Sequence, residues 1–194
     1  MPPKVKITRE DIVQTALDLV RAGGEATLNA RLVAAALHCS TQPVFSNFAT
    51  MEELQRAVIE AGYQYYLGFL EKEAESGKYP TYKAFGMAYV RFAYEEKELF
   101  KLMFMRDRHG AELEPTTDFE MSVNLIMSAN GLSRERAHRM HMEMWVCVHG
   151  IATMLATSFF TPEWDAISEM TTDIYQGLRA RHIQEEKDHG SHTN

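Results

Sequence analysis

The stretch LNARLVAAALHCSTQPVFSNFATMEEL, residues 28–54, decides how this chain of 194 residues folds. Asn29 is placed to cap a helix over residues 30–37, and Ser40 is placed to cap a second helix over residues 41–48. Only a tight turn separates the two, which is the length and spacing of a helix-turn-helix. The same pattern also fits two short helices that simply pack together in an all-helical protein.

The second of these helices has side chains that suit base recognition. In a helix-turn-helix the second helix lies in the major groove of DNA, and its N-terminal residues reach the base edges. Gln and Asn can form two hydrogen bonds with adenine, while Thr or an apolar side chain can touch the methyl group of thymine. The expected base contacts are Thr41, Gln42, Ser46 and Asn47.

The sequence on either side of this stretch also predicts helices. Thr8 can cap a helix that stops at Gly23-Gly24, and Thr50 with Glu53 makes a capping box for a helix that continues to about residue 76. No bounded alternation of apolar and polar residues predicts a strand. Further helices are expected after Pro80 and at about residues 99–105, 117–130, 133–160 and 163–186, with a polar loop at 107–115. We therefore predict an all-α fold of about nine helices.

Composition limits the class of protein. The hydrophobic share of 45% and the charged share of 24% are typical of a globular protein. Cys39 and Cys147 are too few for a disulfide framework, and the N-terminus lacks the apolar core of a signal peptide, so we expect a cytoplasmic protein. The formal net charge of −7 argues against nucleic-acid binding through bulk positive charge.

Residues 8–62 resemble the DNA-binding domain of the tetracycline-repressor (TetR) family of bacterial regulators. The resemblance lies in TREDIVQTALDLVRAGG and in LNARLVAAALHCSTQPVFSNFATMEELQRAVIEA. The positions that fit the family pattern are Leu28, Arg31, Leu32, Leu37, Ser40, Val44, Phe48, Thr50 and Leu54. Phe45 stands where the family usually has Tyr, Asn47 where it often has His or Tyr, and Met51 where it often has Lys. These departures predict fewer phosphate contacts than is usual.

The resemblance implies a function and an organisation. It implies a ligand-responsive regulator, a repressor that binds a palindromic DNA operator as a homodimer and is released by a small apolar or aromatic effector. We expect no enzymatic activity, no cofactor and no metal. The expected parts are a helix-turn-helix DNA-binding domain at residues 1–50, a connecting helix at 51–76, a helical ligand-binding and dimerisation domain at 77–187, and a disordered tail at 188–194. The residues expected to contact the DNA backbone or pack on sugars are Lys4, Lys6, Thr8, Arg9, Asn29, Arg31 and Phe45.

Charge is distributed unevenly between these parts. Residues 1–62 hold six basic and seven acidic side chains, so most of the negative charge lies in the remainder of the chain. The DNA-binding part is thus close to neutral. This predicts a shallow salt dependence of binding and reliance on base contacts and on the dimer for affinity.

Two segments of the C-terminal part resemble one TetR subgroup. They are AYVRFAYEEKELFKLMF, residues 88–104, and the Trp-His-Gly signature formed by Trp145, His149 and Gly150. Trp145 and His149 share a helix face with His141 and Thr153. This face could be ordinary core, the wall of a ligand pocket, or a haem or metal site. The last alternative would use His138, His141, His149 and Glu143.

Two further sets of residues are predicted from the pattern of apolar side chains. Aromatic and Met side chains suit an adaptable cavity, although they are core by default. The residues expected at a ligand pocket are Phe85, Tyr89, Phe92, Phe100, Met103, Phe104, Phe119, Met127, His141, Met144, Trp145 and His149. Stripes on the last two helices predict a four-helix dimer interface. Its expected residues are Val148, Ala152, Leu155, Phe159, Ile167, Met170, Ile174 and Leu178. These stripes could instead pack within the chain.

Overall fold

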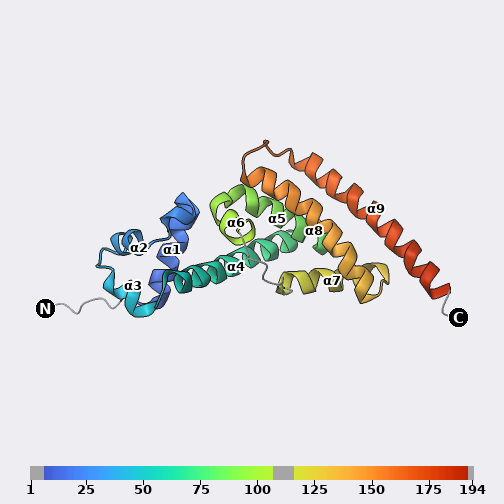
Figure 1. Ribbon diagram of the computed structural model, residues 1–194. Coiled ribbons are helices and arrows are strands. Elements are labelled where there is room, and N and C mark those ends of the chain that lie inside the picture. Colours follow the sequence, from blue (N-terminus) through green and yellow to red (C-terminus); the bar gives the residue numbers. More distant parts are fainter. Residues whose placement is uncertain (1–6, 107–115, 192–194) are drawn as a thin grey trace. The chain divides into compact units, whose positions relative to one another are not determined.

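The computed structural model describes residues 7–106 and 116–191 and is all-helical, as the sequence predicts (Figure 1). Within these ranges it contains nine α-helices, one short 3-10 helix and no strand. Lys4, Lys6 and the expected polar loop at 107–115 lie outside the described residues. None of the described helices is long and apolar enough to cross a lipid bilayer.

The chain divides into two compact units. The first unit is Met1–Tyr66 with Glu95–Asp107, and the second is Leu67–Tyr94 with Arg108–Asn194. The helices of the first unit are α1 (Arg9–Gly23), η1 (Glu25–Thr27), α2 (Ala30–Ala36), α3 (Gln42–Asn47), the first part of α4 (Met51–Glu75) and α6 (Lys97–Phe104). The second unit holds the rest of α4, α5 (Thr81–Glu95, without its last residue), α7 (Thr117–Asn130), α8 (Arg134–Ala156) and α9 (Trp164–Ser191).

Two of the expected N-terminal caps are present. The Thr8 hydroxyl accepts from the Asp11 amide at 3.1 Å and the Asp11 carboxylate accepts from the Thr8 amide at 2.9 Å, which together form a capping box for α1. Asn29 caps α2 by accepting from the Leu32 amide at 3.0 Å. The boundaries of the first two helices therefore follow from local side-chain chemistry.

The prediction that Ser40 caps the third helix is wrong. The first helical hydrogen bond runs from the Phe45 amide to the Thr41 carbonyl at 3.2 Å, so Thr41 is the N-cap of α3. The helix also ends one residue early, because Phe48 has extended backbone angles. The capping box expected before α4 is only half formed: Thr50 accepts from the Glu53 amide, but the Glu53 carboxylate accepts from the Ala49 amide.

Helix α6 packs with the N-terminal helices although it follows α5 in the sequence. It lies against α1 and η1. Gly62 of α4 faces Leu99 and Met103 of α6 so closely that a Cβ atom would approach a Leu99 methyl to 3.0 Å. Residues 97–104 thus belong structurally with the first unit, whereas the domain boundaries expected from the sequence remain a prediction.

In the second unit, helices α8 and α9 end at residues other than those predicted from the sequence. Helix α8 stops at Ala156, before the expected end near residue 160, because Ser158 has a positive φ of 57° and the Phe159 amide turns back to the Met154 carbonyl. The chain therefore reverses before Pro162. Helix α9 continues through Ser191, so the part of the expected tail at 188–191 is helical, while residues 192–194 lie outside the described residues.

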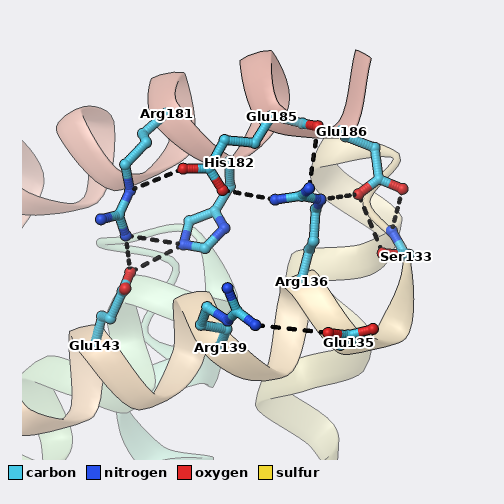
Figure 2. Close-up of polar contacts among 9 residues, drawn as sticks. All are labelled: Ser133, Glu135, Arg136, Arg139, Glu143, Arg181, His182, Glu185 and Glu186. Atoms are coloured by element: carbon cyan, nitrogen blue, oxygen red, sulfur yellow. Dashed lines mark hydrogen bonds and ion pairs between the residues drawn. The ribbon is translucent and has the colours of Figure 1, made fainter. Parts of the chain in front are cut away.

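A polar network joins α8 to α9 (Figure 2). The Arg136 guanidinium lies 2.6 Å from the Glu185 carboxylate and 2.9 Å from the Glu186 carboxylate. Further along α8, the Glu143 carboxylate bonds to Arg181 and, at 2.9 Å, to the Nε2 atom of His182, which is fully buried. This network fixes which face of α9 lies against α8.

Candidate functional site

Helices α2 and α3 form a helix-turn-helix in the first unit. They pack against each other and both contact α1. Val33 and Val44 are completely buried and hold the two helices in this core. In the turn, His38 has a positive φ of 52° and the Cys39 amide bonds back to the Ala34 carbonyl at 2.9 Å. Burial of Val44 on one side of α3 leaves its other side exposed.

Two of the four expected base-reading side chains use their donors inside α3. The Ser46 hydroxyl donates to the Gln42 carbonyl at 2.9 Å, and the Asn47 side-chain amide donates to the Pro43 carbonyl at 2.8 Å. Thr41 is half-buried at the N-cap. The Gln42 side-chain amide, in contrast, is exposed and has no hydrogen-bond partner among the described residues. Within this set, Gln42 is therefore the residue whose side-chain amide is left exposed without an internal bond among the described residues.

The residues expected to contact the DNA backbone also differ in what their side chains do in the structure. Thr8 and Asn29 serve as helix caps, whereas Arg31 and Phe45 are exposed. Arg9 holds the unit together: its guanidinium donates to the Asn47 carbonyl at 2.7 Å and to Glu53 at 3.1 Å, and it stacks on the Phe48 ring. No local sequence signal indicates this contact, because its hydrogen-bond partners lie 38 to 44 residues away.

In the second unit, two Tyr–His pairs connect α5 and α8. The Tyr82 hydroxyl lies 3.0 Å from Nδ1 of His141, and the Tyr89 hydroxyl lies 2.8 Å from Nδ1 of His149. Trp145 stacks on the His149 ring, with the ring centroids 4.8 Å apart and the planes at 12°. Tyr82 is not among the residues predicted from the sequence. A signal for it exists, because Tyr82 and Tyr89 are seven residues apart and the two histidines are eight residues apart, so two facing helices can bring both pairs into contact.

Burial controls the protonation of both histidines. It lowers the pKa of His141 to about 4, with smaller effects from the charges of Asp118, which raises it, and His138, which lowers it. Burial also lowers the pKa of His149 below its usual value. Both imidazoles are therefore neutral near pH 7 and can exchange hydrogen bonds with the tyrosine hydroxyls or with a neutral ligand.

The residues expected at a ligand pocket fall in both units. Phe100, Met103 and Phe104 lie on α6 in the first unit, and the other members of the set lie in the second. Most are core side chains: those that are buried are Phe85, Tyr89, Phe92, Phe100, Met103, His141 and Met144. The half-buried members are Phe104, Phe119, Met127, Trp145 and His149. Of these, Trp145 and His149 lie together, and His149 contacts Tyr89.

The side chains of the alternative haem or metal site do not gather into a metal-binding group in the part of the chain that the structure describes. No group of three His, Cys, Asp or Glu side chains there is arranged to hold a metal ion. Glu143, one of the four residues of that alternative, is bonded to Arg181 and His182 instead. His141 and His149 are each bonded to a tyrosine.

The residues of the expected dimer stripe differ in their exposure within the single chain. The chain itself buries Val148, Ala152, Leu155 and Ile167, because these side chains face the core of the second unit. Ile174 and Leu178 are half-buried, and Leu178 packs on the cluster around Val123 and Met140. Phe159 lies beyond the end of α8 and, like Met170, is exposed. On α8 the large apolar side chains exposed to solvent are Val146 and Met154.

Comparisons with known proteins relate this arrangement of helices to TetR-like transcriptional regulators. Residues 82–175 match the family model described as "Tetracyclin repressor-like, C-terminal domain". A TetR-like transcriptional regulator from Rhodococcus sp. RHA1 has a similar structure, with a TM-score of 0.61 and 13% identity over 95% of this chain and 98% of that chain. No curated protein matches the sequence.

Residues 82–175 thus match a TetR-family C-terminal domain, and the fold of the chain is that of a TetR-like regulator. The family model covers nearly all of α5, then α6, α7 and α8, and the first part of α9. The structural match extends the similarity of fold to almost the whole chain. Assignment to the Trp-His-Gly subgroup remains a prediction.

Proposed function

We propose that this protein is a ligand-responsive repressor that binds a palindromic DNA operator as a homodimer in the cytoplasm, and that it is not an enzyme. The observation that carries the proposal is the helix-turn-helix of this TetR-like chain, in which burial of Val44 leaves Gln42 and Phe45 exposed on α3. Residues 1–50 would bind DNA, and residues 77–187 would bind the effector and the second subunit. Helix α4 would connect these two parts.

Selection from a random double-stranded DNA library tests this proposal. The full chain is expected to enrich a palindrome whose half-sites lie about 10 base pairs, or a multiple, apart, because two symmetry-related recognition helices reach successive major grooves. Gln42→Ala should weaken binding to the selected duplex about tenfold, the amount that one good base contact contributes. Failure to enrich any sequence at low salt would refute the DNA-binding function.

Exposed apolar side chains on α8 and α9 support the homodimer. Val146 is 60% exposed, Met154 is 38% exposed and Met170 on α9 is 49% exposed. Gly150 lies between the first two on the same side of α8, and no heavy atom approaches its Cβ position within 4 Å. A second copy could therefore pack closely against this side of α8. We therefore place the second copy against Val146, Gly150 and Met154, where the chain leaves its own surface exposed.

Val146→Glu tests the homodimer in the palindrome experiment, because it places a charge on the exposed side of α8. It should give a monomeric mass in light scattering at micromolar concentration and lose binding to the selected palindrome. Met121→Glu is the control, because Met121 is an apolar residue of similar exposure on α7. If both variants keep the mass of the wild-type protein and that mass is a dimer, the interface lies elsewhere.

The effector proposed is a small apolar or aromatic molecule. Support comes from Tyr89, Trp145 and His149, which combine flat rings with a neutral imidazole and a hydroxyl group. Such a set suits a planar ligand with a few polar atoms.

A thermal-shift screen checks the effector class. A planar aromatic compound at about 100 times its Kd should stabilise the protein by about 2.7 kcal/mol. Trp145→Ala should remove the shift, whereas Phe159→Ala, which alters an exposed ring beyond α8, should leave it unchanged. A library of such compounds without a single stabiliser would contradict this class of effector.

A further inference from the structure

We infer that Phe45 reads the methyl group of a thymine, next to an adenine read by Gln42, so that each half-site contains an A·T step recognised partly through apolar contact. This inference rests on the proposed DNA-binding function and specifies the chemistry of its site. It changes the role of Phe45 from packing on the DNA backbone to discriminating between bases.

The first support is the position of the two side chains. Gln42 and Phe45 are three residues apart on α3 and so share one face of the helix. Both are exposed, with 53% of Phe45 accessible to solvent, while Val44 behind them is completely buried. A large apolar ring held in water on a recognition helix has an unfavourable environment that contact with an apolar partner would relieve.

The second support is what the other residues of α3 do. The Ser46 hydroxyl and the Asn47 side-chain amide donate to carbonyls of their own helix, so these donors are occupied. The Gln42 side chain has no such bond within the described residues, so it can donate to N7 of an adenine and accept from its N6 amino group. Phe45 lacks a hydroxyl group, so in the major groove its complementary group is the C5 methyl of thymine.

The third support is that two arginines of the first unit are engaged in contacts within that unit. Arg9 is bonded to the Asn47 carbonyl and to Glu53, and Arg21 is bonded to Glu96. Both arginines therefore stabilise the first unit itself. With electrostatic affinity reduced in this way, contacts in the groove must supply a larger share of the binding free energy.

The experiment uses the full chain and the duplex selected from the random library. Each thymine of the selected site is replaced in turn by deoxyuridine, which removes only the C5 methyl group. At one position in each half-site the wild-type protein is expected to lose about fivefold in affinity. Phe45→Ala should bind the thymine duplex about fivefold more weakly than wild type and should no longer distinguish it from the uridine duplex.

Two further variants complete the design. Phe45→Tyr keeps the ring, so it should keep the preference for thymine. Met121→Ala removes an exposed apolar side chain of α7 in the second unit and should behave as wild type. If the duplex is selected and bound but no position responds to uridine, or if Phe45→Ala keeps the full response, the inference is wrong and the proposed function stands. If no duplex is selected, both fail.

Discussion

Replacing Arg21 by Met is expected to lower the free energy of unfolding of the first unit by about 2–3 kcal/mol. The Arg21 guanidinium makes two hydrogen bonds to the Glu96 carboxylate, at 2.6 and 2.9 Å, and a third to the Tyr65 hydroxyl at 3.0 Å. It also lies over the Tyr65 ring at 4.5 Å. The bonds with Glu96 raise the pKa of Arg21 above its usual value, so the pair remains charged. These contacts join α1, α4 and the start of α6.

The cost arises from the carboxylate that remains. The Glu96 side chain is only 11% exposed, and without Arg21 its charge would keep a single strong donor, the Tyr65 hydroxyl at 3.0 Å. Removing one partner of such a pair costs more than removing both charges. The double variant Arg21→Met, Glu96→Gln should therefore be more stable than the sum of the two single changes predicts, by about 1–2 kcal/mol.

Urea unfolding followed by circular dichroism measures this effect. Both tryptophans, Trp145 and Trp164, lie in the second unit, so tryptophan fluorescence follows that unit separately. Arg56→Met on α4 is the matched control, since Arg56 is exposed and a surface change of this kind alters stability by less than about 0.5 kcal/mol. Equal effects of the Arg21 and Arg56 variants would show that the contact with Glu96 contributes nothing.

Lowering the pH from 7 to 4 is expected to remove about 3 kcal/mol of stability from the second unit through His141 alone. Burial lowers the pKa of this imidazole from an ordinary 6.5 to about 4 in the folded protein. Between these two values the unfolded chain binds a proton that the folded chain does not. Stability therefore rises with pH across this window and is complete above about pH 7.

A substitution without a titratable group identifies His141 as the source. His141→Gln retains an acceptor for the Tyr82 hydroxyl, so its unfolding free energy should change much less between pH 4 and 7. His138→Gln, which alters the exposed histidine one turn earlier, is the control and should keep most of the wild-type profile, because burial affects the pKa of His141 more than the charge of His138 does. Tryptophan fluorescence during urea unfolding at each pH provides the measurement. A profile that is the same for wild type and His141→Gln would contradict the assignment.

The parts of the fold that the sequence predicts well depend on local chemistry. Thr8 and Asn29 mark helix starts because their side chains bond to amides three residues away, and Gly131 marks the end of α7 because it adopts a left-handed conformation. Ser40 is not the cap of α3 because the helix begins one residue later: Thr41 is the N-cap by its backbone hydrogen bond, and its side chain makes no capping hydrogen bond. The grouping of α6 with α1 depends on contacts between residues far apart in sequence, which periodicity does not report.

In the candidate site, too, some features could be predicted from the sequence and others could not. Exposure of Gln42 and Phe45 follows from the helix-turn-helix pattern once Val44 is assigned to the core. The bonds of Ser46 and Asn47 within α3 cannot be read from the sequence, because each of these side chains can bond either to DNA or to its own helix. On α8, apolar residues occur on more than one face, so hydrophobicity alone assigns Val148 to the dimer where burial assigns it to the core.

The position of α6 has a consequence for how such a protein can be divided or recombined. The first unit is not a continuous piece of sequence, because the chain leaves it within α4 at Tyr66 and re-enters it at Glu95. A cut after α4 would remove the helix that covers Gly62 and the carboxylate that pairs with Arg21. Exchange of the DNA-binding unit between related proteins would therefore have to transfer residues 95–106 as well. Without them, the surface of α4 around Gly62 would be exposed to solvent.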